Sequence, residues 1–242
     1  MERAQYLAAL SADGSLLSQV AARGLSTSVP SCPGWTVADA VRHTAQVYEH
    51  KIACIELGGT KPDPWPPEWP VDRDPITWFD DAHHRLTDTL RAADPSAPSW
   101  TWWPEDQTVG FWARRMAHET AVHRVDVQLA FASPTPVDHD LAIDGIDELL
   151  DLMLAGDWSD EAQPDLTGTA TIATDQRAWT IRMTADRVSI HEGREAADAT
   201  IEAEPSSLLL WLYGRAEGDV VTVSGDPGVA RRLRERAALA TQ

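Results

Sequence analysis

The stretch TVGFWARRMAHETAVHRVDVQLA, residues 108–130, is the most informative part of this sequence. Its apolar residues recur at helical spacing behind a threonine suited to capping, which predicts a helix over about 109–132. One side of that helix carries, in order, Trp112, Met116, Glu119 and His123. Because tryptophan and methionine indicate the buried side, the carboxylate and the imidazole on it need a compensating partner.

A metal ion is one such partner. Glu119 and His123 are four residues apart, so their side chains project about one helical turn from each other and can share a cation. A carboxylate with an imidazole suits zinc and also iron, nickel or manganese. The alternative is an ordinary surface pair at i, i+4.

A second inward-facing histidine comes from the helix predicted over about 37–57, which Thr36 caps. His43 lies on the stripe that continues through Val47, His50 and Cys54. Facing helices of a bundle build metal sites from such groups, so we expect His43, Glu119 and His123 to bind the metal. Three protein ligands with an open fourth position are typical of catalytic zinc. His50, about 10 Å further along, is the competing ligand, or else a solvated or capping histidine.

The first half of the chain is expected to be an all-α, up-and-down bundle of four helices, over about 3–22, 37–57, 76–93 and 109–132. The two long connections between them are rich in proline and tryptophan and are expected to line the rim of a site. The other histidines of the helices, His83, His84 and His118, are expected to be solvated. Cys32 and Cys54 are expected to be structural thiols.

The pattern changes after Ser133-Pro134-Thr135-Pro136, and we place the domain boundary there, giving domains 1–135 and 136–242. A helix over about 141–154 leads into short alternating segments separated by turn residues. A buried helix over 206–214, a last strand and an amphipathic terminal helix follow. This order predicts an α+β domain with a mostly antiparallel sheet.

The charge balance excludes several functions. The chain has 20 basic and 38 acidic residues, a net charge of -18, which repels nucleic acid and anionic lipid. It has neither a signal-like start nor an apolar run long enough to cross a membrane. We expect a cytoplasmic protein, monomeric or a small homo-oligomer, that acts on small molecules without nucleic-acid or membrane partners.

Two long strings, SVPSCPGWTVADAVRHTAQV (28–47) and residues 108–130, resemble the signature blocks of the mycothiol-dependent maleylpyruvate isomerase family of actinobacteria. The strings LTGTATIAT, ATIEAEPSSLLLWLYGR and VSGDP are similar to that family's second domain. The resemblance implies a DinB-like metal-binding bundle followed by a sterol-carrier-protein-like domain. It also implies zinc on His43, Glu119 and His123, and mycothiol as thiol cosubstrate.

Within that resemblance, Arg215 matches an arginine of the second domain that reaches the active site and binds a carboxylate of substrate or mycothiol; a structural salt bridge is the alternative. The implied activity is addition of a metal-bound thiolate to an electrophilic small molecule, as an isomerase or an S-transferase. Two other functions stay open. One is a non-catalytic module that binds metal or an apolar ligand, and the other is a thiol-independent, DinB-like hydrolase or transferase.

Overall fold

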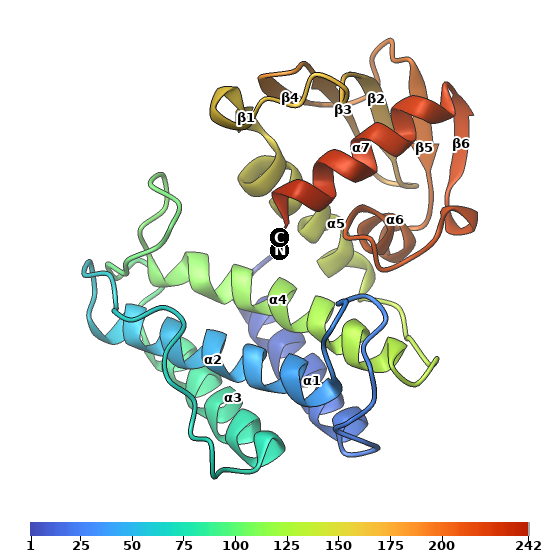
Figure 1. Ribbon diagram of the computed structural model, residues 1–242. Helices are drawn as coiled ribbons and strands as arrows, with labels where there is room; N and C mark the ends of the chain where they lie inside the picture. The colour runs from blue at the N-terminus through green and yellow to red at the C-terminus, as the bar shows by residue number, and fades with distance from the viewer. Residues whose placement is uncertain (242) are drawn as a thin grey trace. The chain divides into compact units, whose positions relative to one another are not determined.

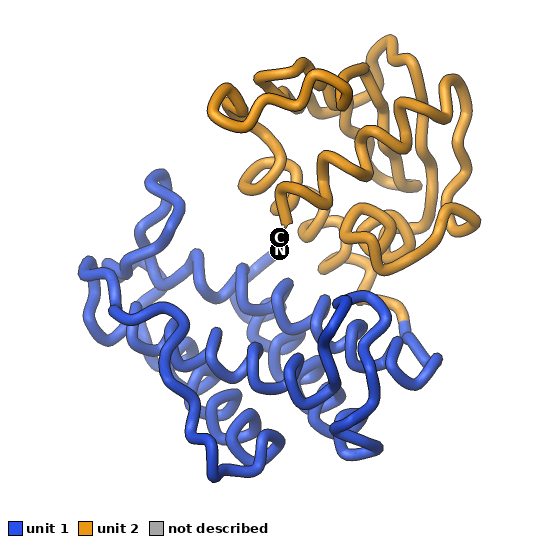
Figure 2. Tube along the Cα trace, viewed as in Figure 1, with its two compact units in different colours: residues 1–135 blue, residues 136–242 orange. Residues whose placement is uncertain are grey.

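The computed structural model describes residues 1–241 and divides into two compact units, Met1–Thr135 and Pro136–Gln242 (Figures 1 and 2). Gln242, the last residue of the predicted second domain, lies outside the described residues. Among the helices of residues 1–241, none combines the length and the apolar character that a membrane span needs.

The first unit is made of four helices, which confirms the predicted all-α bundle. They are α1 (Arg3–Ala21), α2 (Val37–Glu56), α3 (Pro75–Ala92) and α4 (Val109–Leu129). α1 packs mainly against α4 and α3, and α2 packs against the same two helices. Thr36 begins α2 with a reciprocal capping box, in which its hydroxyl accepts from the amide of Asp39 and its own amide donates to the Asp39 carboxylate.

The Pro-rich connection between α2 and α3 lies along α2. The Arg42 guanidinium lies 4.4 Å from the Trp69 ring, and the Lys51 ammonium 4.6 Å from the Trp65 ring. Between these contacts the Gln46 side-chain amide donates to the carbonyl of Pro67 at 2.7 Å. Two cation–π contacts and one hydrogen bond therefore attach this loop to three side chains of one helix.

Several side chains that the sequence placed in solvent are buried. His83 is only 4% exposed, and its Nε2 lies 3.0 Å from the carbonyl oxygen of Leu10 on α1. Gly14 allows this approach, because a Cβ there would lie 2.4 Å from His83 Nε2. His118 is 2% exposed and packs edge-on against Tyr6. The expectation of solvated histidines was therefore wrong for both, since an imidazole with a carbonyl or aromatic neighbour is readily buried.

The second unit contains a six-stranded sheet in the order β1-β4-β3-β2-β5-β6. Its strands are β1 (Gly156–Asp157), β2 (Gly168–Ala173), β3 (Ala178–Met183), β4 (Arg187–Glu192), β5 (Ala199–Glu202) and β6 (Thr222–Gly225). Each pair of neighbouring strands is antiparallel except β2 and β5, which run parallel. The predicted α+β class with a mostly antiparallel sheet is confirmed.

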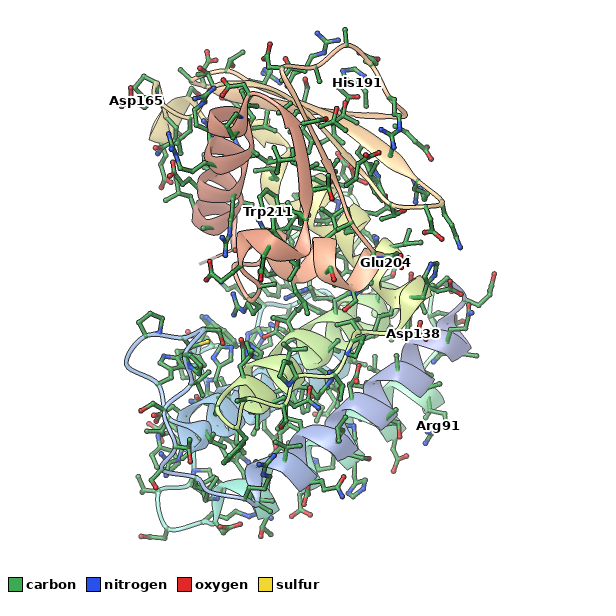
Figure 3. The ribbon with its side chains drawn as sticks, turned by 90° about the vertical axis from the view of Figure 1, so that its right-hand side faces the viewer. Arg91, Asp138, Asp165, His191, Glu204 and Trp211 are labelled. Carbon is green, nitrogen blue, oxygen red and sulfur yellow. The ribbon has the colours of Figure 1, made fainter. Side chains whose placement is uncertain are left out.

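The helices of this unit are α5 (His139–Glu148), α6 (Pro205–Leu212) and α7 (Pro227–Ala240). The prediction of a single helix to about residue 154 is wrong in one respect, because the α-helix ends at Glu148 and the chain continues as a π-helix over Leu149–Leu154. α7 packs across β2 and β5 (Figure 1). Trp211 of α6, labelled in Figure 3, lies 5.9 Å from the guanidinium carbon of Arg234 on α7.

Gly225 lies at the end of β6, where a substitution tests how closely β6 packs against the chain beside β5. Its φ is +83°, and a Cβ there would lie 2.3 Å from the backbone oxygen of Asp198. Gly193 also has a positive φ, +98°, with open space around its Cβ position. We expect Gly193→Ala to cost about 1–2 kcal/mol for the left-handed backbone alone, and Gly225→Ala to cost clearly more, because β6 must move away from β5. Urea unfolding of both variants measures the difference, and equal losses would contradict the steric argument.

Candidate metal centre

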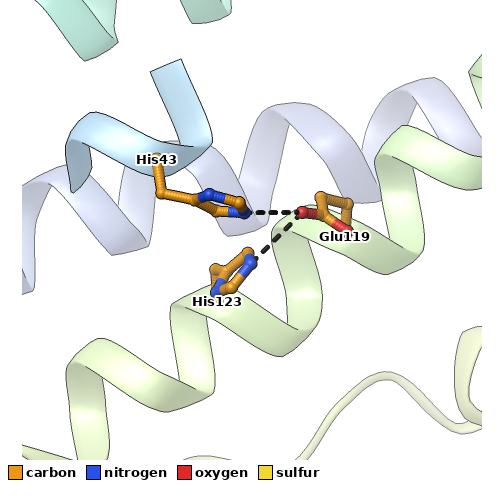
Figure 4. A group of neighbouring side chains, drawn as sticks. All are labelled: His43, Glu119 and His123. Atoms are coloured by element: carbon orange, nitrogen blue, oxygen red, sulfur yellow. Dashed lines mark ion pairs between the residues drawn. The ribbon is translucent and has the colours of Figure 1, made fainter. Parts of the chain in front are cut away.

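Three side chains from α2 and α4 converge in the first unit. His43 on α2 places Nε2 3.5 Å from Oε1 of Glu119, and His123 places its own Nε2 3.2 Å from the same oxygen (Figure 4). One ligand atom from each of the three residues lies within 4.8 Å of the others. The sequence predicted this set, and the structure brings all three together.

The group is mostly buried but open on one side. The side chains of Glu119 and His123 are 13% and 11% exposed, whereas that of His43 is 35% exposed. A buried carboxylate between two imidazoles is an unusual arrangement unless a cation or a proton is shared. The exposure of His43 indicates the side from which a small molecule can reach the group.

The charges around Glu119 keep it ionised. Burial by itself would raise the pKa of this carboxyl, but the Arg115 guanidinium and the His123 imidazole hold it well below its usual value. Arg115 donates directly to Oε2, the oxygen that faces away from the two histidines. Oε1 is therefore left toward His43 and His123, where it can accept a proton or bind a cation.

A second carboxylate lies behind His123. Asp126, fully buried, accepts from His123 Nδ1 at 3.0 Å, and the hydroxyl of Ser31 donates to its other oxygen at 2.6 Å. Although burial would lower the pKa of His123, Glu119 and Asp126 together raise it to about 9. These carboxylates favour the protonated form of the ring, and Asp126 holds it with Nε2 toward Glu119.

The loop before α2 covers the centre with an aromatic ring. Trp35 lies 5.0 Å from the ring of His43 and stacks on that of His123 at 6.3 Å, with 17° between the planes. The loop closes on itself, because the amide of Val29 donates to the carbonyl of Trp35 at 2.9 Å. The same turn therefore supplies Ser31 beneath His123 and Trp35 beside both imidazoles.

The donor set fits a divalent cation. One carboxylate oxygen and two imidazole nitrogens are among the commonest zinc ligands, and they leave a coordination position for a further molecule. Among residues 1–241 this is the one group of three or more His, Cys, Asp or Glu side chains close enough to hold an ion.

Two other residues from the sequence lie elsewhere. His50 is buried beside Trp65, at 4.6 Å between ring centres, with Nδ1 near Lys51 and Cys54. It is thus neither a member of the three-residue group nor the solvated histidine that was expected. Arg215 belongs to the second unit, where Nη1 donates to the carbonyl of Tyr213 at 2.7 Å.

Three residues that support the centre were not predicted from the sequence: Ser31, Trp35 and Asp126. A signal existed for Asp126, because a carboxylate between Val125 and Val127, three residues after a candidate ligand, has to find a buried partner. Ser31 and Trp35 had no such signal, since only the folded loop brings them to α4.

Comparisons with known proteins cover most of the chain. The model of the mycothiol maleylpyruvate isomerase N-terminal domain matches residues 7–128, and that of the family's C-terminal domain matches residues 140–232. No curated protein matches the sequence.

Two solved structures resemble most of the chain in fold. A crystal structure of the mycothiol-dependent maleylpyruvate isomerase is 13% identical, with a TM-score of 0.65 over 93% of this chain and 95% of its own. A mutant of that isomerase gives 12% identity, with the same coverage and TM-score. The ubiquinone synthesis protein UbiJ-SCP2 covers 42% of this chain with a TM-score of 0.31, too low to support the predicted sterol-carrier likeness.

Proposed function

Since the chain belongs to the mycothiol maleylpyruvate isomerase family, we propose that it is a metal-dependent enzyme in which the thiolate of mycothiol adds to an electrophilic small molecule. The adduct is either released as an isomer of the substrate or kept as a thioether, as in an S-transferase. The observation that carries the proposal is the convergence of His43, Glu119 and His123 on one point at a partly open edge of the bundle. The substrate is maleylpyruvate or another activated alkene, by analogy with the family.

In this proposal His43, Glu119 and His123 hold a divalent ion, and the chemistry of these donors fits zinc. Zinc in such a site supplies a Lewis acid that keeps a bound thiol deprotonated at neutral pH. With one anionic and two neutral protein ligands, the site retains one positive charge. It therefore attracts an anionic partner in spite of the net charge of the chain, -18.

The other residues of the centre prepare it for that chemistry. Asp126 accepts from His123 Nδ1, which orients the ring and leaves Nε2 as the ligand atom. Arg115 holds one Glu119 oxygen so that the other faces the histidines. Trp35 covers both rings and excludes water from that side. Arg215 is the proposed carboxylate-binding residue from the second unit.

Isothermal titration calorimetry of the zinc-loaded protein with mycothiol tests the proposal. Saturable binding is expected, together with a change in the absorption spectrum of a cobalt-substituted sample as sulfur enters the coordination sphere. Oxidised mycothiol, which has no free thiol, is the control and should leave the spectrum unchanged. Absence of heat and of spectral change would contradict the use of this thiol, as would full turnover of an electrophile with no thiol present.

Asp126→Asn tests the role of the buried carboxylate. The amide keeps the size of the side chain but loses the charge that orients His123, so we expect zinc affinity to fall about 10- to 100-fold. Competition with a chromophoric chelator measures it. Ser31→Ala, which removes only one hydrogen bond to Asp126, should have a smaller effect. Unchanged affinity in Asp126→Asn would show that the carboxylate does not act through the metal ligand.

A further inference from the structure

Lys51 is a buried amine outside the metal centre. The lysine is 8% exposed, and its Nζ lies 4.6 Å from the ring centres of both Trp65 and Trp112. Trp112 is fully buried, whereas Trp65 is 49% exposed and forms the outer wall. The amine thus lies between two indole rings, of which Trp65 is the one exposed to solvent.

The partner of this amine is an imidazole and not a carboxylate. Nζ lies 3.1 Å from His50 Nδ1, and within residues 1–241 no Asp or Glu oxygen forms an ion pair with it. His50 is itself 4% exposed, and its Nε2 has no hydrogen-bond partner. A lysine kept from water without a carboxylate has a weakened preference for the ammonium form.

The charged groups around the amine are few. Cys54 of α2 and Glu119 of α4 both raise the pKa of Lys51, whereas Arg115 of α4 lowers it. Lys61, on the loop after α2, lowers the pKa of His50. Burial is the largest effect, and together these groups lower the pKa of Lys51 to about 8. Burial also lowers the pKa of His50 to about 4, so its ring is neutral at pH 7 and can exchange a proton with the amine.

We infer that Lys51 is a nucleophilic amine that forms an imine with small aldehydes or ketones, using His50 as its proton-exchange partner. Desolvation and a neighbouring cation are the two means by which lysines are activated for this chemistry. The inference does not depend on the metal centre or on mycothiol. Nothing in it requires His43, Glu119 or His123 to hold an ion.

The reaction needs only the carbonyl compound. The Nζ lone pair attacks the carbonyl carbon, a C–N bond forms, and a proton passes from nitrogen to the oxygen, with His50 Nδ1 within reach to relay it. Loss of that hydroxyl as water, with loss of the second nitrogen proton, leaves C=N. No oxidant or reductant is consumed in forming the imine.

Reductive trapping on the full chain tests the inference, because the sequence has only two lysines, Lys51 and the exposed Lys61. The protein is treated with acetaldehyde and cyanoborohydride, and alkylation of each lysine is measured by peptide mass spectrometry. We expect Lys51 to react several-fold faster than Lys61 at pH 7, with a rate that rises toward pH 8 and then levels as the amine becomes neutral. The preference should vanish in urea.

Two outcomes would overturn the inference: alkylation of Lys61 without Lys51 in the folded protein, or a preference for Lys51 that persists in urea. His50→Gln, checked for folding by circular dichroism, should slow alkylation of Lys51 several-fold and leave that of Lys61 unchanged. An unchanged rate at Lys51 would remove His50 from the proposal. Lys51→Arg gives the background signal from Lys61 and the N-terminus.

Discussion

The His123→Ala variant is expected to purify without a divalent metal ion, whereas the wild-type protein is expected to carry about one per chain. The imidazole supplies one of only three protein ligands, and it is the one that Asp126 holds in place. Two remaining ligands, His43 and Glu119, do not form a site that competes with water and buffer for zinc. Metal analysis by mass spectrometry after gel filtration measures the number of ions per chain. Competition with a chromophoric chelator measures the zinc affinity, which we expect to fall at least 100-fold.

The matched control is His84→Ala. His84 is exposed on α3 and takes no part in the centre, so this variant should retain the ion. Removing an imidazole from elsewhere in the chain thus separates the loss of a ligand from a general effect of the substitution. A wild-type protein that is metal-free and takes up no zinc on titration would refute the metal centre itself.

How far the centre follows from the sequence depends on the range of the interactions. Glu119 and His123 are neighbours on one helix, so their proximity follows from helical geometry alone. Placing His43 beside them required the further inference that α2 and α4 face each other. The pattern of buried residues on the two helices supports that inference. Trp35 and Ser31 could not be predicted, because their positions depend on how the loop before α2 closes onto α4.

Three histidines that were expected to be solvated are buried in the structure. His50, His83 and His118 are polar by composition, and a sequence pattern places such residues in solvent by default. The structure gives each a specific neighbour that only the folded chain provides: Trp65, the Leu10 carbonyl and Tyr6. The parallel pairing of β2 with β5 was missed for a similar reason, since alternation within a strand does not reveal its partner.

Arg124→Ala is expected to lower the stability of the first unit by about 3–5 kcal/mol, the usual cost of removing one partner from a buried charged network. Arg124 is 1% exposed and its Nε donates to Asp13 on α1 at 3.1 Å. Its Nη1 donates to Gln128 Oε1 at 2.8 Å and to the carbonyl of Thr135 at 2.6 Å. The guanidinium thus joins α1, α4 and the end of the first unit, and its loss leaves acceptors on Asp13, Gln128 and Thr135 without that donor.

Urea unfolding measures this loss, and hydrogen exchange read separately for residues 1–135 and 136–241 assigns it to one unit. Arg91→Ala is the control, because its pair with Asp88 is exposed and exposed pairs contribute little. Arg124→Lys keeps the charge but lacks the planar fork that reaches the acceptors on all three residues, so its stability should fall between that of the alanine variant and that of the wild type. A loss below about 1 kcal/mol in Arg124→Ala would mean that water replaces the guanidinium, and that the network does not hold α1 and α4 together.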